Sequence, residues 1–134
     1  MSKQKGFTLI ELTIVLAILA IIAAILIPTF LTTTDRARLR GDIQSARVIQ
    51  NAMELYRVER GVAVSGATMD EKLQNLSDAG YLDLRNAQTQ TQGAAWVYDE
   101  SVGIVLVSIP SNTGASRAYE NLSDSERQFV RINS

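Results

Sequence analysis

The sequence predicts an α+β fold: a long N-terminal helix that carries a small, mainly antiparallel β-sheet head packed on its C-terminal half. Apolar residues crowd into the first 31 positions of the 134-residue chain, and apolar residues at helical spacing continue after them to Arg60. Runs of strand-forming residues come only later, after residue 94. A helix from Phe7 to Arg60 would be about 80 Å long, so a domain of this size cannot bury all of it.

The first element is an uncharged run of twenty residues, Leu12 to Leu31. As a helix, this run is long enough to cross the roughly 30 Å core of a bilayer. A secretory signal peptide explains it poorly, because the apolar part of such a peptide is only about 7 to 15 residues long. A plain single-pass anchor explains the length but not Glu11, since a carboxylate inside a spanning helix costs about 2.5–3.5 kcal/mol on insertion scales.

The residues around Glu11 resemble the processing motif of the type IV prepilins and pseudopilins. The motif follows a short basic leader, precedes the apolar run and reads Gly6-Phe7-Thr8-Leu9-Ile10-Glu11. The resemblance implies that residues 1–6 are a leader, which a prepilin peptidase removes by cutting between Gly6 and Phe7. It also implies that the same enzyme methylates the new N-terminus at Phe7, and that Glu11 is the acidic residue needed for subunit assembly.

Phe7 and Glu11 are four residues apart and would share one face of a helix. Cleavage would give Phe7 an ammonium group. This group and the Glu11 carboxylate are each costly alone in lipid, and each can neutralise the other. The resemblance implies that Glu11 pairs with the N-terminus of a neighbouring subunit, whereas the spacing also permits a pair within one subunit.

Residues 7–31 are thus assigned to a transmembrane and polymerisation helix, which contains Pro28. Proline removes a helical hydrogen bond, and neighbouring helices can satisfy the freed carbonyl in a membrane. We therefore predict a helix kink at Pro28, near the membrane exit. The resemblance adds that residues 20–28 can lose helicity when packed in a filament.

Residues 32–60 predict an amphipathic continuation of the helix, ended by Gly61. The apolar arc is wider than one packed sheet requires. We expect one side to pack on the head's own sheet and another to face neighbouring subunits; the alternative is a thoroughly buried helix. The first apolar stripe contains Leu39, Ile43, Ala46, Ile49, Met53 and Tyr56, and the second contains Val48, Ala52 and Leu55.

The remaining chain divides into a polar connecting region, residues 61–94, and a β-sheet head with the C-terminal segment, residues 95–134. In the first we expect a short helix over Thr68–Leu76, capped by Thr68 and Glu71, and an exposed loop over Gln88–Gly93. In the second we expect strands over Ala95–Tyr98, Val102–Ile109 and Gln128–Ile132, and a short helix starting near Ser123.

Composition argues against catalysis. The sequence has no His and no Cys, which removes the ordinary near-neutral proton shuttle, thiol chemistry and disulfides. The formal net charge of −1 gives no strong nucleic-acid signal. Near the C-terminus, Asp124 and Glu126 are the acidic residues that could contribute to a calcium site, but calcium needs six to eight oxygen ligands. We expect no enzyme activity, no cofactor and no metal site.

The resemblance implies a structural subunit of a type IV pilus-like filament, stored in the membrane and polymerised after leader cleavage. Alternatives are a pseudopilin of a type II secretion or DNA-uptake system, and a single-pass anchored binding module that never polymerises. Implied partners are identical or related subunits, prepilin peptidase, an assembly platform with its ATPase machinery, and membrane lipid. The implied location is the inner (cytoplasmic) membrane, then an extracellular or periplasm-spanning filament. Lysines and arginines flank both ends of the apolar run, so this orientation rests on the resemblance.

Overall fold

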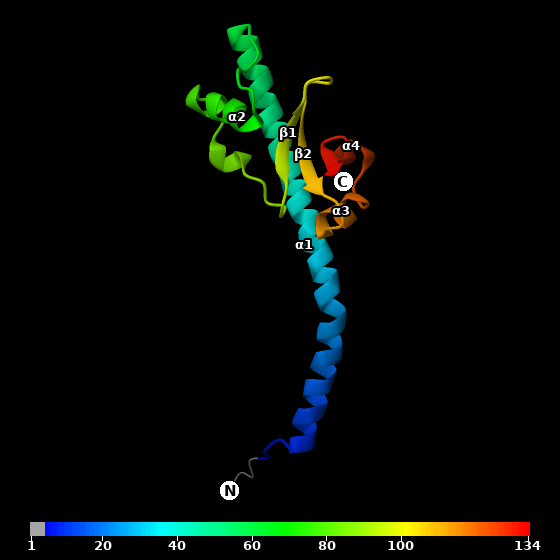
Figure 1. Cartoon of the computed structure of the whole chain (residues 1–134). Coiled ribbons are helices and arrows are strands. Elements are labelled where there is room, and N and C mark those ends of the chain that lie inside the picture. The colour runs from blue at the N-terminus through cyan, green and yellow to red at the C-terminus, as the bar shows by residue number, and fades with distance from the viewer. Residues whose placement is uncertain (1–4) are drawn as a thin grey trace.

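The computed structural model describes residues 5–134 and confirms the α+β class. One long helix runs the length of the molecule, and all the other elements gather on its C-terminal half (Figure 1). In chain order the elements are α1 (Leu9–Arg60), α2 (Met69–Asp78), the 3-10 helix η1 (Leu84–Ala87), β1 (Ala95–Asp99), β2 (Ile104–Pro110), α3 (Gly114–Tyr119), α4 (Asp124–Arg127) and β3 (Val130–Asn133).

Helix α1 has 52 residues, and defined caps set both its ends. Thr8 is extended and caps the N-terminus, so the helix begins two residues later than predicted. Gly61 ends it in the left-handed conformation (φ 71°), and its N–H donates to the Arg57 carbonyl at 2.9 Å. The helix continues through Pro28 without interruption, and at about 1.5 Å per residue it is about 80 Å long.

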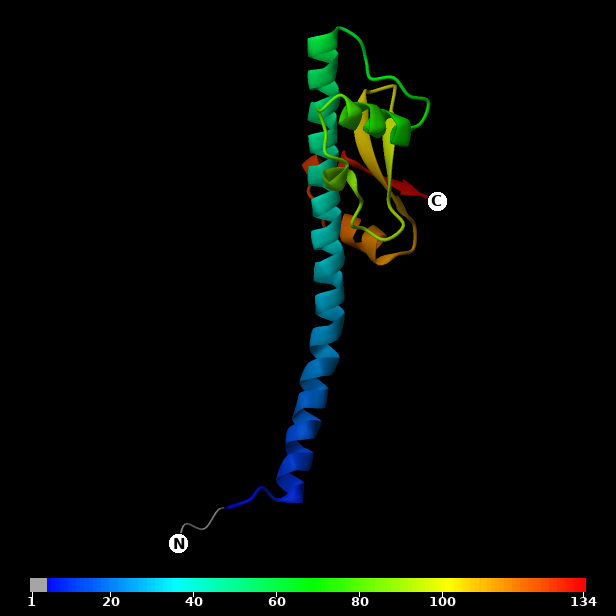
Figure 2. The ribbon, with the colours of Figure 1, turned by 90° about the vertical axis from the view of Figure 1, so that its left-hand side faces the viewer.

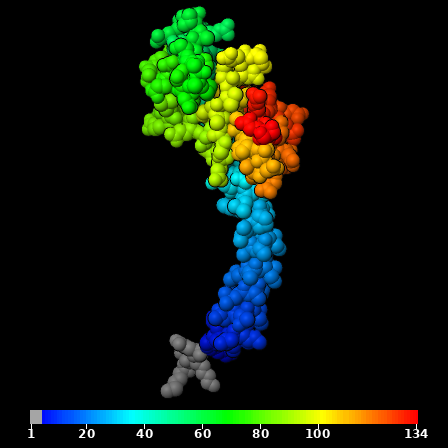
Figure 3. Space-filling view, viewed as in Figure 1, coloured from blue at the N-terminus to red at the C-terminus, as the bar shows by residue number. Residues whose placement is uncertain are grey.

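Most of the head lies on one side of α1, and a quarter-turn of the view shows the sheet and α2 beside the helix (Figure 2). The space-filling view shows the N-terminal half of α1 standing alone below the head (Figure 3). Burial along α1 follows this division, because its first buried residue is Leu39. The second stripe splits: Ala52 is buried, whereas Val48 and Leu55 are about half exposed, at 47% and 49%.

The sheet has three strands in the order β1-β2-β3. Strands β1 and β2 are antiparallel, with Val97 opposite Leu106, whereas β2 and β3 are parallel, with Ile109 opposite Ile132. The sheet is thus mixed, because the chain crosses through α3 and α4 before it pairs again with β2. Strand β2 is central and buried over residues 105–109, as its unbroken apolar run predicts.

Strand boundaries differ from the predicted ones where turns intervene. Strand β2 begins at Ile104, because Gly103 (φ 74°) belongs to the hairpin turn and its N–H donates to the Asp99 carbonyl at 2.7 Å. Strand β3 begins at Val130, because the N–H of Phe129 still donates to the Glu126 carbonyl at the end of α4.

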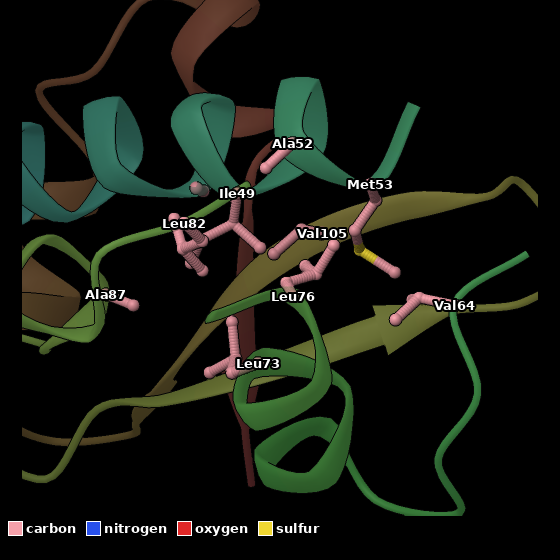
Figure 4. Packing of buried hydrophobic residues seen from close by; sticks show 10 residues of the cluster. Ile49, Ala52, Met53, Val64, Leu73, Leu76, Leu82, Ala87 and Val105 are labelled. Carbon is pink, nitrogen blue, oxygen red and sulfur yellow. The ribbon is translucent and has the colours of Figure 1, made fainter. Parts of the chain in front are cut away.

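Two apolar clusters join the head to α1. Figure 4 shows the distal cluster, in which α1, α2 and β2 meet around Ile49, Leu76 and Val105, all fully buried. The proximal cluster lies nearer the bare half of α1, and its members are Leu39, Ile43, Val107, Ile109, Ala115, Ala118, Leu122 and Val130. Since each buried Leu, Ile or Val contributes about 1.5–3 kcal/mol, these clusters are the main source of head stability.

The loop over residues 88–93 is largely exposed, as expected, and a buried carboxylate ties it to α1. Asp42 is fully buried, and its two oxygens accept the backbone N–H groups of Gln90 at 2.7 Å and Thr91 at 2.9 Å. Thr91 is in turn only 6% exposed. The burial of Thr91 is the exception that polar composition does not predict, because the Asp42 acceptor lies 48 residues before Gln90 in the chain.

Candidate processing and assembly site

The predicted cleavage site lies on accessible chain ahead of α1. Phe7 is 92% exposed. A Cβ atom added to Gly6 would meet nothing within 4 Å, so neither packing nor a left-handed backbone requires glycine there. Residues 1–4 of the predicted leader lie outside the described residues.

Glu11 closes a capping box with Thr8 at the start of α1. The Thr8 N–H donates to Glu11 Oε2 at 2.8 Å, and the Thr8 hydroxyl donates to the same oxygen at 3.0 Å. In the reciprocal contact, Thr8 Oγ1 accepts the Glu11 N–H at 3.3 Å. A carboxylate here also favours the positive end of the helix dipole. The Glu11 carboxylate, whose charge is costly in an apolar helix, thus has hydrogen-bond donors within its own chain.

The capping box occupies only one of the two carboxylate oxygens. Both bonds from Thr8 reach Oε2, while Oε1 accepts no hydrogen bond from any residue between 5 and 134. A carboxylate oxygen offers about two lone-pair sites. Glu11 can therefore accept a further donor without giving up its Thr8 contacts.

The structure places Phe7 outside α1, so the expectation that Phe7 and Glu11 share a helical face is wrong for the uncleaved chain. Thr8 is the residue that sequence reasoning missed. The signal was available, because threonine followed three residues later by glutamate is the sequence pattern of a capping box.

The apolar half of α1 has no covering in the single chain. It contains an 18-residue window with a mean hydropathy of 3.0, of which none is buried, and this is the one helix in residues 5–134 that is long and apolar enough to cross a membrane. Its hydroxyls are satisfied internally: Thr13 donates to the Leu9 carbonyl at 2.9 Å, and Thr29 donates to Ile25 at 3.3 Å. Because these hydroxyls donate to carbonyls of the preceding helical turn, few polar groups on this surface lack a hydrogen-bond partner.

A second exposed apolar surface lies on the head-bearing half of α1. It consists of Val48, Leu55 and Val58, which are 47%, 49% and 80% exposed, and we call it the outer face. By contrast, Leu39, Ile43 and Ala46 on the same half of the helix are buried against the head. The helix is thus not thoroughly buried, and one of its sides is free for other contacts.

Comparisons with known proteins match this N-terminal segment. The family model described as the prokaryotic N-terminal methylation motif matches residues 1–27. The chain is 41% identical over 64 residues to prepilin peptidase-dependent protein A of Clostridium perfringens, which covers 48% of this chain and 46% of that protein. It is 43% identical over 68 residues to a fimbrial protein of Pseudomonas aeruginosa, covering 51% and 44% of the two chains.

A third relative is named as a component of a secretion system. The chain is 32% identical over 62 residues to type II secretion system core protein G of Vibrio cholerae, covering 46% of this chain and 42% of that protein. The chain thus spans about half the length of the relatives it matches. A comparison with solved structures gives no significant match. The motif match and these relatives confirm the resemblance to type IV pilins and pseudopilins that the residues around Glu11 predict.

Proposed function

We propose that this chain is a structural subunit of a type IV pilus or pseudopilus, stored in the membrane and polymerised after removal of its leader. The observation that carries the proposal is the division of α1. One half is apolar and bare, with a carboxylate at its start, and the other half carries a folded head. The role is structural and needs no catalysis by this chain.

We propose that residues 1–6 are the leader, and that prepilin peptidase cuts between Gly6 and Phe7 and methylates Phe7. The accessibility of both residues supports this assignment. Relatives named for their dependence on prepilin peptidase support it as well. The cytoplasmic membrane, with the head outside, is the proposed place of storage, and an assembly platform with an ATPase is the proposed partner in polymerisation.

Glu11 is the residue that we propose sets the position of a new subunit. Moving an apolar helix from lipid into a filament core brings no hydrophobic gain, because lipid tails are as apolar as leucine. Polar contacts and close packing must therefore select one register. The free Oε1 of Glu11 is suited to the Phe7 ammonium group of a neighbouring subunit. The outer face, Val48, Leu55 and Val58, supplies a second contact surface between subunits.

Replacement of Glu11 by Ala tests this proposal. We expect the variant to be cleaved and membrane-bound like the natural chain, but to give at least about tenfold fewer filaments, since a charged hydrogen bond worth about 1.5–3 kcal/mol is lost at each subunit. Shear-released filaments are quantified by immunoblot and electron microscopy. Thr13→Val is the matched control, because the Thr13 hydroxyl contacts only the carbonyl of Leu9. Normal filament yield from Glu11→Ala would refute the pairing role.

A further inference from the structure

A pocket with a mixed polar and apolar lining lies where the head meets the bare half of α1. Its volume is about 430 Å³, and it is lined by Asp35 of α1, residues 91–93, Pro110 and the start of α3. In Figure 1, α3 lies at the lower end of the head, just above the part of α1 that stands alone. With the apolar half of α1 in a bilayer, this pocket lies near the membrane surface.

Asp35 provides the pocket with an unpaired carboxylate. Within residues 5–134 it takes part in no ion pair within 4.0 Å and in none of the side-chain hydrogen bonds. It lies directly against Gly114 of α3, where an added Cβ atom would collide with Asp35 Oδ2. Glycine at position 114 therefore permits the carboxylate to occupy this place in the pocket wall.

The height of Asp35 matches the headgroup layer of a bilayer. Asp35 follows Leu31, the last residue of the apolar run, by four residues, which is about 6 Å of helix. The headgroup region on each side of the hydrocarbon core is about 5–8 Å thick. Arg36 and Arg38 follow Asp35 on the helix, and neither forms an ion pair within the described chain. Negative and positive groups thus lie side by side at the level where a zwitterionic lipid carries its ammonium and phosphate.

We propose that this pocket binds the headgroup of a phospholipid with a primary ammonium, of the ethanolamine class. Asp35 accepts the ammonium N–H groups, and Arg36 or Arg38 pairs with the phosphate. A quaternary choline headgroup has the same charge but no N–H to donate, so the pocket discriminates between the two. The inference rests on the proposed membrane location of α1. Bound lipid would hold the head upright on the membrane until the subunit is extracted.

Lipid titration of the full chain in detergent micelles, read by native mass spectrometry, tests this proposal. We expect the ethanolamine lipid to bind about three- to tenfold tighter than the choline lipid with identical acyl chains, as for hydrogen bonds to a charged group that remains partly hydrated. Asp35→Asn should bring the ratio close to one. Asp78→Asn, an exposed carboxylate on α2 that is distant in sequence from the pocket, is the matched control and should keep the ratio.

Gly114→Ala separates position from charge, because its methyl group displaces the Asp35 carboxylate while all charges remain. It should also lower the ratio, and thermal unfolding of each variant in micelles verifies that the head is folded. A ratio near one in the natural chain would overturn the proposal. So would an unchanged ratio in folded Asp35→Asn, leaving Asp35 a purely structural charge beside α3. Neither result touches filament assembly, so failure here is distinct from failure of the proposed function.

Discussion

Single residues fix how the connecting region sits on α1, and Asp42 is the main one. Its carboxylate is fully buried and accepts two hydrogen bonds, from the N–H groups of Gln90 and Thr91. Gln50 acts similarly near the other end of the head, where its amide donates to the Gly103 carbonyl at 3.0 Å and accepts the Val105 N–H at 2.8 Å. Both side chains substitute for backbone partners that a loop and a strand edge otherwise lack.

Asp42→Ala should destabilise the head by about 3 kcal/mol, because it leaves the N–H groups of Gln90 and the buried Thr91 without their acceptor and opens a small cavity. Asp42→Asn should cost less, since the amide oxygen can still accept one of the two bonds. Urea unfolding of the full chain in micelles, followed by the fluorescence of Trp96, gives both values. The exposed Asp78→Ala serves as control and should shift stability by less than about 0.5 kcal/mol. A loss below about 1 kcal/mol in Asp42→Ala would contradict this account of the loop.

At the scale of elements, local sequence signals predict some helices and strands and miss others. Helix α4 follows Ser123 as expected, and α2 begins after Thr68, whose hydroxyl accepts the Glu71 N–H at 3.3 Å. The Glu71 side chain instead accepts from Ala67, one residue before the partner that a capping box predicts. Helix α3 was not predicted, although Thr113 and Ser116 cap it. The parallel placement of β3 depends on how α3 and α4 pack, which periodicity alone does not encode.

Helix α4 is held against α1 by a carboxylate that titrates. Glu126 Oε2 accepts the Ser123 N–H at 2.9 Å and its hydroxyl at 3.0 Å, and Oε1 pairs with Arg40 Nε at 3.0 Å. These contacts, led by the backbone N–H, hold the pKa of Glu126 below its usual value. A carboxyl whose pKa is lowered by folding stabilises the folded state above its unfolded pKa, about 4.3, and loses that contribution as the pH falls through the folded pKa.

The stability difference between the natural chain and Glu126→Gln should therefore be largest near neutral pH and shrink below about pH 4. Thermal unfolding midpoints of both proteins in micelles, measured from pH 7 to pH 3, give this difference directly. Subtracting the midpoint of the variant from that of the natural chain removes the effect of the other carboxylates, which titrate in both proteins. A gap that stays constant down to pH 3 would show that the Glu126 charge contributes nothing to holding α4.

At the scale of the whole molecule, the two halves of α1 suit two different environments. Its first half matches lipid, with internally bonded hydroxyls and an apolar surface, and its second half forms one wall of the head. The sequence could predict this division because charge and hydropathy change sharply after Leu31. The spacing of Thr8 and Glu11 is also the sequence pattern of a capping box, in which Thr8 holds one oxygen of Glu11. The contacts between subunits remain proposals, since they lie outside a single chain.

The mass of the mature chain tests the central claim most directly. Protein extracted from membranes of its native host is digested, and its N-terminal peptide is sequenced by mass spectrometry. We expect the chain to begin at an N-methylated Phe7, with residues 1–6 absent, and we expect Gly6→Leu to retain the leader. A mature protein that still begins at Met1 in the presence of active prepilin peptidase would contradict the claim that this chain is a processed filament subunit.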